Sequence, residues 1–466
     1  MDRGDVEGGE LLGDALTVAE LPFDELDEAL RWLDGHIDFE STMPSRRSLP
    51  TLDRMHAVMA ALGDPHLSIP SIHVTGTNGK GSTSAMLTCL LMAQGLTVGT
   101  YTSPNLHRVS ERIARDGEPI SNAALLTVLS QLAAVEPLLG ERLTRFELLT
   151  AAALSWFGDE AVDAMVIEVG LGGTWDCTNV VHGDVALLTN VSYDHTDVLG
   201  PTLEGIAADK AGILEPGKPV VIGETHPDLV EVVLAAAAEV GAGPVWVTGQ
   251  DFGCASNEVA VGGRLVTLWT PGSRYEDLLV PLHGAHQGAN ASGAVAAAEA
   301  FFGRPLDEDV VSAGLAAVRV PGRLEVLGRR PLFLVDGAHN VAGMTALGLS
   351  LAEEFAVDGE KVAVVGMLSG RDPSAMLAAL APAGIARVIA CEPDSPRAIP
   401  ARDVAEAGRA LGMTVLVEPV VADAVALARG VVDTTGLIVV AGSLYVVGDA
   451  RGVILSAAVP WEEAGG

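Results

Sequence analysis

Basic residues are scarce in this chain of 466 residues: 28 Lys and Arg stand against 61 Asp and Glu, which gives a formal net charge of −33. A surface this acidic repels nucleic acid and anionic membranes, so an anionic substrate must be met by a local positive site. Aromatic residues are also few, at 4%, although stacking platforms for single-stranded nucleic acid depend on them. The composition disfavours a nucleic-acid-directed ATPase and predicts neither a nucleic-acid nor a membrane partner.

Cysteines and long apolar runs are limited as well. The four cysteines are Cys89, Cys177, Cys254 and Cys391. They form no C-x-x-C pair, which argues against a zinc cluster or a disulfide scaffold and indicates a reducing compartment. The start, MDRGDVEGGE, lacks the basic and apolar regions of a signal peptide, and no window approaches 18 apolar residues. We therefore expect a soluble cytoplasmic protein.

What the chain does contain is an alternation of strand-like and helix-like runs, which is typical of α/β domains with parallel sheets. Its length predicts two or three domains. The expected strands of the first series are 71–76, 96–103, 163–170, 184–192 and 219–223. The expected helices among them are 82–94, 146–156, 203–214, 229–239 and 286–302.

A second series of strand-like runs begins near residue 330. It comprises LFLVDGAHN, KVAVVGML, ARVIACEP, TVLVEP and GLIVVAGS. Between the two series lies VRVPGRLE, with Pro and Gly at its middle. We predict a P-loop-type, mostly parallel sheet domain at 1–320, with a helix and a polar loop within its first 50 residues. A linker at 321–326 and a smaller Rossmann-like α/β domain at 327–466 follow it.

The stretch HVTGTNGKGSTSAML at 73–87 predicts a phosphate-binding loop. A strand, a glycine turn, a lysine and a helix follow one another, so backbone N–H groups and the helix N-terminus form a cradle for an anion. The spelling departs from a strict Walker loop, because Val74 stands where the first Gly is expected and Gly81 where a hydroxyl is expected. A tight turn with a solvated Lys80 is the competing interpretation.

Three further positions carry ionisable groups, two at strand ends and one on a helix. Glu168 ends an apolar strand and is a natural carboxylate for Mg²⁺, although an end-of-strand charge in water is the alternative. His195 follows another strand at the edge where open sheets bind ligands, although a structural or solvated histidine is the alternative. Lys210 lies on a helix of small and apolar residues, where a lysine that reaches solvent is the default.

Ten segments now occur in an order that resembles one family. They are HVTGTNGKGS, YTSPNL, RFE, EVGLGG, DHTDVLG, KAGI, GAHQGAN, VPGRLE, DGAHN and GSLYVVGDAR. Together they are similar to the folylpolyglutamate synthases and bifunctional dihydrofolate/folylpolyglutamate synthases of the Mur ligase superfamily, over about residues 25–452. That family spells its loop G-T-N-G-K, followed by Gly-Ser or Gly-Thr, so the resemblance accounts for both departures from the Walker pattern.

The resemblance implies a role for each matching residue. The expected ATP contacts are Gly76, Thr77, Asn78, Gly79, Lys80, Gly81, Ser82, Asn290, Arg323 and Asp336. The expected magnesium positions are Ser103, Glu168, His195 and Lys210, the last as a carbamate, which reverses the solvent-facing interpretation. The expected pterin side is Thr144, Arg145, Phe146, Glu147 and Trp175. The expected catalytic residues are Lys80, Glu168, Asp176, His195, Lys210 and His339, with His339 and Ser443 on the glutamate side.

The implied reaction is an ATP- and Mg²⁺-dependent amide ligation. The folate or dihydropteroate carboxylate attacks the γ-phosphate of ATP, and the amine of L-glutamate then displaces phosphate from the acyl phosphate. Because water would hydrolyse that intermediate, a cleft closed by two domains suits the chemistry. The resemblance further implies a monomer.

One departure from the family pattern is visible. The family commonly has an arginine in GLGGRxDATN, whereas this chain reads GLGGTWDCTN with Thr174 and Trp175. Either the acceptor preference differs, or another arginine such as Arg145 compensates. Two other functions remain as alternatives: a ligase that joins an amino acid to a cell-wall peptide, and a P-loop nucleotide switch without ligase activity.

Overall fold

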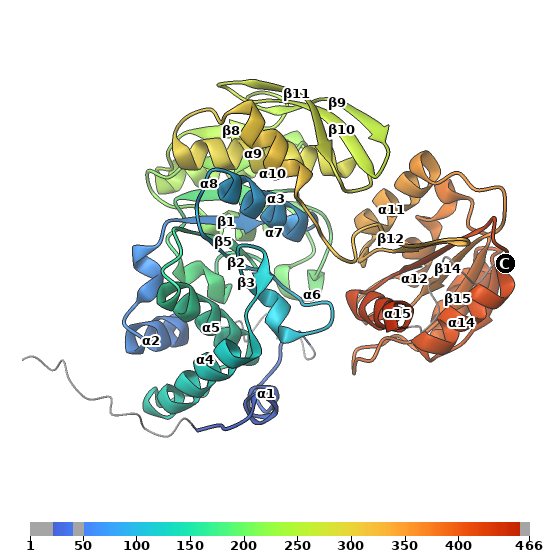
Figure 1. Cartoon of the computed structure of the whole chain (residues 1–466), viewed down its shortest axis with the longest axis horizontal. Helices are drawn as coiled ribbons and strands as arrows, with labels where there is room; N and C mark the ends of the chain where they lie inside the picture. Colours follow the sequence, from blue (N-terminus) through green and yellow to red (C-terminus); the bar gives the residue numbers. More distant parts are fainter. Residues whose placement is uncertain (1–21, 41–50, 457–466) are drawn as a thin grey trace, which may run out of the picture.

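The computed structural model describes residues 22–40 and 51–456 (Figure 1). The predicted N-terminal helix is α1 (Leu26–Asp34). Most of the polar loop predicted after it, residues 41–50, lies outside the described residues. Two sheet-containing bodies follow along the chain, coloured blue to yellow and orange to red in Figure 1.

The first body is built on an eight-stranded sheet with the order β4-β3-β2-β5-β1-β6-β7-β8. Six neighbouring strands run parallel, and only the pairs β2–β3 and β3–β4, next to one edge of the sheet, are antiparallel. The strands are β1 (Ser71–Thr75), β2 (Val98–Tyr101), β3 (Ile113–Arg115), β4 (Glu118–Pro119), β5 (Ala164–Glu168), β6 (Val185–Leu188), β7 (Val220–Ile222) and β8 (Val245–Val247).

Helices cover both faces of this sheet, which is why its central strands are buried along their whole length. On β5, Val166 packs into the core on one face, and Met165 and Ile167 pack into the core on the other. The first face carries α3 (Lys80–Ala93), α9 (His286–Phe302) and α10 (Glu308–Ala316). The second face carries α1, α2 (Asp53–Ala61), α4 (Asn122–Val135), α5 (Arg145–Asp159), α7 (Leu203–Lys210) and α8 (Pro227–Val240).

A three-stranded antiparallel sheet, absent from the sequence prediction, packs against α9. Its strands are β9 (Gly253–Ala260), β10 (Gly263–Trp269) and β11 (Arg274–Val280), in the order β11-β10-β9. Each strand mixes polar with apolar residues, and only part of it is buried, as Val266, Leu268 and Tyr275 in the core illustrate. Such half-buried strands carry a weaker apolar signal than the strands of the parallel sheet.

The second body has a six-stranded sheet with the order β12-β13-β17-β14-β15-β16, parallel except for β12. The strands are β12 (Glu325–Arg329), β13 (Leu332–Val335), β14 (Lys361–Val365), β15 (Arg387–Ala390), β16 (Thr414–Val417) and β17 (Leu437–Ala441). The helices are α11 (Val341–Glu354), α12 (Pro373–Ala378) and α13 (Ala401–Ala410) on one face, and α14 (Val421–Val431) and α15 (Leu444–Ser456) on the other. All five strands predicted for this series are present, and β12 is additional.

The predicted α/β class, with two mostly parallel sheets, is confirmed. Segments that follow the carboxyl ends of β1, β2, β5 and β6 meet segments that follow β13, β14, β15 and β17 around shared cavities. Ligands of open α/β sheets bind at this edge, so the sheet topology itself places a site between the two bodies. Within the residues described, none of the helices combines the length and the apolar character needed to span a membrane.

Candidate active site

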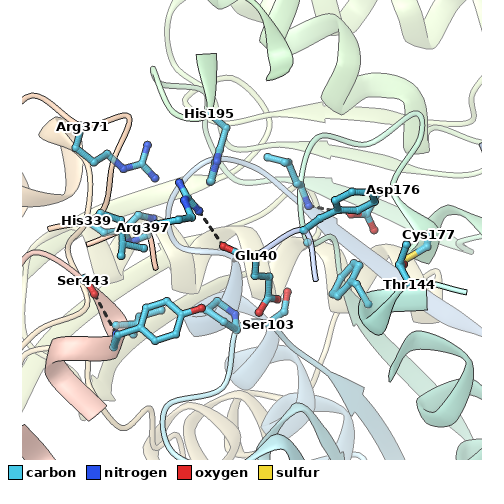
Figure 2. A pocket seen from close by; sticks show the side chains of 18 of the residues that line it. Glu40, Ser103, Thr144, Asp176, Cys177, His195, His339, Arg371, Arg397 and Ser443 are labelled. Carbon is cyan, nitrogen blue, oxygen red and sulfur yellow. Dashed lines mark hydrogen bonds between the residues drawn. The ribbon is translucent and has the colours of Figure 1, made fainter. Parts of the chain in front are cut away.

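Two adjoining cavities lie between the bodies. One is lined by the glycine loop and by segments of the second body, and the other by apolar side chains of the first body together with arginines of the second. In the second cavity, Arg371, His339 and Arg397 approach from one side and Asp176 and Thr144 from the other (Figure 2). The residues that line both cavities are Ser103, Pro104, Gly170, Leu171, His195, His339 and Leu444.

The glycine loop turns directly from β1 into α3, as predicted, and α3 begins at Lys80. Gly79 precedes it with a φ of 85°, and a side chain there would collide with Asn290. Glycine therefore satisfies both a left-handed backbone and a close approach. Lys80 Nζ donates to the carbonyl oxygens of Gly76 at 3.1 Å and Thr77 at 3.3 Å. The loop thus presents a helix N-terminus and an ammonium group to the cavity.

Lys210 is buried, with 4% of its surface exposed. Its Nζ donates to the Gly76 carbonyl oxygen at 2.7 Å, so it shares this acceptor with Lys80. Burial, together with the charge of Lys80, lowers the pKa of Lys210 to about 7. The interpretation of Lys210 as a lysine that reaches solvent is wrong: α7 packs its C-terminal end under the glycine loop.

Glu168 at the end of β5 is also buried, so the alternative of a charge in water is wrong. Its Oε2 accepts a hydrogen bond from the Ser103 backbone N–H at 3.3 Å. Burial raises the pKa of Glu168, although Lys80 and Arg323 oppose the rise. A Cβ at Gly81 would lie 3.6 Å from Glu168 Oε2, so the carboxylate faces the start of α3.

The donor atoms fit a magnesium site of the kind that substrate phosphates complete. Within residues 22–40 and 51–456, no group of three or more His, Cys, Asp and Glu side chains could hold a metal by itself. Mg²⁺ at nucleotide sites uses one or two protein ligands, with phosphates and waters supplying the rest. The buried carboxylate of Glu168 lines the same cavity as Ser103, His195 and the glycine loop, and a cation there would neutralise its buried charge.

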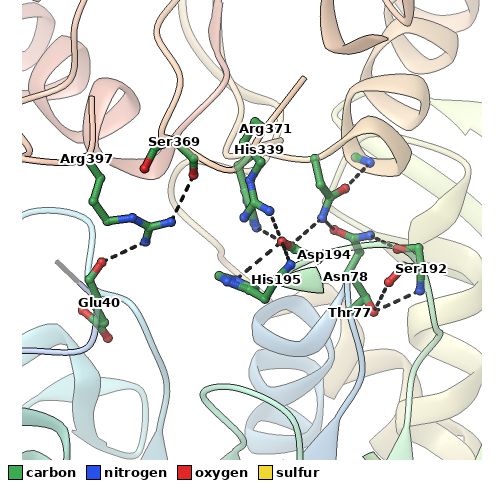
Figure 3. A network of polar contacts seen from close by, with 12 residues as sticks. Glu40, Thr77, Asn78, Ser192, Asp194, His195, His339, Ser369, Arg371 and Arg397 are labelled. Carbon is green, nitrogen blue, oxygen red and sulfur yellow. Dashed lines mark hydrogen bonds and ion pairs between the residues drawn. The ribbon is translucent and has the colours of Figure 1, made fainter. Parts of the chain in front are cut away.

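Asp194 connects the two bodies at this point (Figure 3). Its carboxylate accepts a hydrogen bond from Asn340 Nδ2 at 3.0 Å, forms an ion pair with Arg371 and lies 3.4 Å from His339 Nε2. Burial raises the pKa of Asp194, but His195, His339 and Arg371 together hold it well below its usual range. Asp194 stays ionised and binds three side chains of the second body.

His195 adjoins this carboxylate and has a left-handed φ of 49°. Burial lowers the pKa of His195 to about 3, against the attraction of Asp194. The ring is therefore neutral near pH 7, and a neutral imidazole can offer a nitrogen lone pair to a metal.

The other three residues predicted to contact ATP line the same cavity as the glycine loop. Asn290 on α9 donates through Nδ2 to Gln287 Oε1 at 2.9 Å. Asp336 follows β13, and its carboxylate accepts hydrogen bonds from the Leu324 and Ala338 backbone N–H groups at 2.8 Å each. Arg323 lines the same cavity. The structure therefore brings together all predicted nucleotide residues around one cavity.

The two residues predicted on the glutamate side differ in their surroundings. His339 lies where the two cavities meet, with Nδ1 2.8 Å from the Gly337 carbonyl oxygen. Ser443 lines the arginine-containing cavity, but it is buried and its Oγ accepts hydrogen bonds from the Tyr445 and Val446 backbone N–H groups. Its hydroxyl caps the first turn of α15.

The predicted pterin-side segment is an N-terminal capping box of α5. Thr144 Oγ1 accepts a hydrogen bond from the Glu147 N–H, and Glu147 Oε2 accepts one from the Thr144 N–H. Thr144, Phe146 and Glu147 line the arginine-containing cavity, whereas Arg145 points elsewhere and pairs with Asp34. Helix capping by itself is therefore enough to explain the presence of Thr144 and Glu147 in this segment.

Asp176 has a structural function that its motif does not reveal. Its Oδ2 accepts a hydrogen bond from the Leu171 N–H at 2.8 Å, and its Oδ1 accepts from the Thr178 N–H at 3.0 Å. Burial raises the pKa of Asp176. The carboxylate fixes the glycine turn that follows β5, and this turn forms part of both cavities.

The side chains of the unusual pair Thr174 and Trp175 lie in different surroundings. Trp175 lines the arginine-containing cavity, whereas Thr174 is exposed and donates through Oγ1 to the Asp209 carbonyl oxygen at 3.2 Å. Arg145 does not line that cavity, so it does not compensate for the missing arginine.

Two arginines that the sequence prediction did not select supply the positive charge. Arg371 follows β14 and Arg397 follows β15, and both line the cavity. Arg397 donates to the backbone oxygens of Glu40 at 2.9 Å and Ser369 at 3.2 Å (Figure 3). Their position after two predicted strands, at the edge where ligands bind, was the signal that could have identified them.

Two family models match the chain: the Mur ligase middle domain over residues 74–298 and the Mur ligase glutamate ligase domain over residues 322–444. The fold and the site therefore define a member of the Mur ligase family.

Similar proteins narrow this assignment. The dihydrofolate synthase/folylpolyglutamate synthase of Mycobacterium tuberculosis is 40% identical over 411 residues, which cover 83% of this chain and 82% of the relative. The folylpolyglutamate synthase of Lacticaseibacillus casei is 39% identical over 357 residues, covering 74% and 82%. The chain belongs to the dihydrofolate synthase/folylpolyglutamate synthase family, whose members are ATP-dependent ligases that add glutamate to folates. The predicted resemblance is confirmed.

Solved structures agree with this family. The M. tuberculosis folylpolyglutamate synthase complexed with ADP has a TM-score of 0.86 and 37% identity, covering 92% of this chain and 98% of that one. The Escherichia coli FolC in complex with DHPP and ADP has a TM-score of 0.81 and 30% identity, covering 93% and 98%.

Proposed function

We propose that this chain joins L-glutamate to folates, and to dihydropteroate, through an acyl-phosphate intermediate formed from ATP. The observation that carries the proposal is the junction of the two cavities at Ser103, His195 and His339. A γ-phosphate held by the glycine loop would meet, at this junction, a carboxylate that enters from the cavity with the apolar wall. Phosphoryl transfer depends on such positioning more than on covalent chemistry by the protein.

ATP is assigned to the glycine-loop cavity. Residues 76–82 would hold the phosphates, with Lys80 beside the β- and γ-phosphates, and Asn290, Arg323 and Asp336 would make further contacts with the nucleotide. The presence of ADP in the M. tuberculosis and E. coli structures supports this assignment. Lys80 and Arg323 would neutralise charge that develops on the transferred phosphoryl group.

Magnesium is assigned to Glu168, Ser103 and His195, with Lys210 joining them as a carbamate. Bound there, Mg²⁺ supplies charge neutralisation at the phosphates. A pKa of about 7 leaves a large share of the Lys210 amine neutral, and only a neutral amine adds to CO2. Carbamylation would turn the buried ammonium of Lys210 into an anion in the cavity that Glu168 also lines.

The acceptor and glutamate are assigned to the second cavity. Phe146 and Trp175 provide an apolar wall for a pterin ring, and Arg371 and Arg397 provide cations for carboxylates. The α-amine of glutamate would attack the acyl phosphate near His339 and release phosphate. Closure between the two bodies would exclude water from the intermediate.

The organisation of the chain that we propose is the one expected from the sequence: domains at 1–320 and 327–466 joined at 321–326. Strand β12 begins at Glu325, inside the proposed linker. We further propose that the protein is a monomer in the cytoplasm and has no nucleic-acid partner.

The decisive experiment supplies purified protein with Mg-ATP, L-glutamate and either dihydropteroate or tetrahydrofolate, and follows ADP release and product mass. We expect one added glutamate in the product and ADP release that requires the acceptor. If neither acceptor stimulates ADP release, the folate assignment fails, and nucleotide binding without turnover would indicate a switch protein instead. Turnover of a uridine-nucleotide substrate would indicate a cell-wall ligase.

The loop assignment has its own control. Lys80→Ala is expected to reduce acceptor-dependent ADP release by about 100-fold or more, the usual loss when a preorganised charge is removed from a transition state. Lys218→Ala removes a half-exposed lysine that pairs with Asp184 away from the cavities, and should leave turnover unchanged.

A further inference from the structure

Helix α11 spans the contact between the two bodies from end to end. Its N-cap, Asn340, donates through Nδ2 to Asn78 Oδ1 and Asp194 Oδ2 at 3.0 Å each. Its last residue is Glu354. Fourteen residues at about 1.5 Å per residue place these ends roughly 21 Å apart. The far end therefore lies well away from the glycine loop, next to the three-stranded antiparallel sheet.

At that far end, Glu354 forms a buried ion pair with Arg264 of β10. Arg264 Nη1 lies 2.9 Å from Glu354 Oε1, and each side chain is 1% exposed. Two further hydrogen bonds fix the guanidinium group, from Nε to Asn257 Oδ1 at 2.8 Å and from Nη2 to the Asn257 carbonyl oxygen at 2.9 Å. Glu353, which is about half exposed, lies 3.2 Å from Arg264 Nη1.

Glu354 also binds the segment that leads into α9. Its Oε1 accepts a hydrogen bond from the Gly284 N–H at 2.7 Å, and its Oε2 lies 2.8 Å from His283 Nδ1. The His283 ring contacts the Phe355 ring, with centroids 4.8 Å apart. One carboxylate thus holds the C-terminal end of α11 against both β10 and the residues that precede α9.

The nucleotide cavity lies between these two helices. On its α9 side are Gln287 and Asn290, and on its α11 side are Ala342, Gly343 and Ala346. The separation of the two helices therefore contributes to the width of the cavity. Because Glu354 ties one helix to the start of the other, its contacts constrain that width from outside the cavity, which Glu354 and Arg264 do not line.

A buried ion pair is weak evidence for stability, because desolvation offsets most of the attraction, but it requires one particular geometry. We propose that Arg264 and Glu354 are positioning residues for ATP: they anchor α11 to the antiparallel sheet and to the start of α9, and so hold the nucleotide cavity at its working width. The antiparallel sheet is then a docking platform for the second body. This inference rests on the proposed ATP site.

Glu354→Gln tests the anchor with little change in shape. We expect the KM for ATP to rise at least about threefold, the lower range of coupling between contacting residues, and kcat at saturating ATP to change less, because bound nucleotide pulls α11 back into place. Arg264→Met should have the same effect, and the double variant should be no worse than the worse single variant. The midpoint of thermal unfolding of each variant should stay well above the assay temperature, so that partial unfolding does not explain the rise in KM.

Glu360→Gln is the matched control, because it breaks a half-exposed ion pair with Arg387 inside the second body. An unchanged KM for ATP in Glu354→Gln overturns the proposal, as does an equal rise in Glu360→Gln. If Glu354→Gln does not fold, the test moves to Glu353→Gln, which removes the weaker partner of Arg264. A small rise in the KM for ATP then supports the anchor, and an unchanged KM overturns it. Wild-type protein that fails to turn over ATP would refute the proposed function, whereas an active wild type matched by Glu354→Gln refutes only the anchor.

Discussion

Asp194, which follows β6 in the first body, accepts a hydrogen bond from the side chain of Asn340, the N-cap of α11 in the second body, across 3.0 Å. The same carboxylate holds Arg371. One buried aspartate therefore places two residues of the second body next to the proposed phosphoryl-transfer site.

Asp194→Asn should lower kcat/KM for glutamate by at least about tenfold, because truncating one partner of a buried, hydrogen-bonded charge pair leaves the other charge unpaired. Initial rates at varied glutamate would measure the change. Glu204→Gln, at an exposed position in the first turn of α7, serves as the control. Wild-type kinetics in Asp194→Asn would contradict a role for the carboxylate.

Lys210 predicts a pH dependence of stability. Burial lowers its pKa from 10.5 to about 7, so between these values the unfolded chain holds a proton that the folded chain lacks. The free energy of unfolding therefore rises with pH through this window, and the destabilising effect of burial is complete below pH 7.

Lys210→Met should accordingly be more stable than wild type below pH 7, and the difference should fade as the pH approaches 10.5. Denaturant unfolding over a pH series, without bicarbonate, measures it. A difference that does not vary with pH would refute this reasoning.

A carbamate on Lys210 is a separate prediction. Bicarbonate should raise turnover, and carbon NMR with isotopically labelled bicarbonate should detect a carbamate signal that Lys210→Met lacks. Lys218 provides the comparison, because its side chain is about half exposed. The absence of a signal that depends on Lys210 would remove the carbamate from the proposed metal site.

The pair Thr174 and Trp175 predicts unequal effects. Trp175→Ala should raise the KM for the folate acceptor more than that for ATP, because loss of a large apolar side chain from a cavity wall costs about 2 kcal/mol or more. Thr174→Ala should change either KM by less than about twofold, since exposed substitutions have small effects. Initial rates with each substrate varied in turn give both constants, and equal effects at the two positions would contradict the structure.

Closure between the two bodies is the last prediction. Solution X-ray scattering should show compaction when nucleotide and folate are both bound, with the segment 321–326 near the hinge. An unchanged radius of gyration under saturating ligands would exclude a hinge at this segment.

The main parallel strands could be predicted from the sequence because they are rich in apolar residues and glycine marks many of their turns, whereas the short strand β8 and the helices α2, α4 and α10 were not predicted. The same pattern predicts that the glycine loop, Glu168 and the segment DGAHN all lie at strand ends, which is where the fold has them. The antiparallel sheet β9–β11 could not be predicted in the same way, because its strands mix polar with apolar residues and β9 is mostly not buried.

By itself, the sequence determined the family and selected the residues that we assign to the nucleotide, because motif spelling and order depend on local backbone requirements such as the left-handed Gly79. Only the tertiary structure decided which ionisable groups are buried and which meet across the bodies. Burial placed Lys210 under the glycine loop, and domain packing brought Arg371 to Asp194 and Arg264 to Glu354. These contacts join residues that lie 90 or more positions apart in the chain, so no local pattern encodes them.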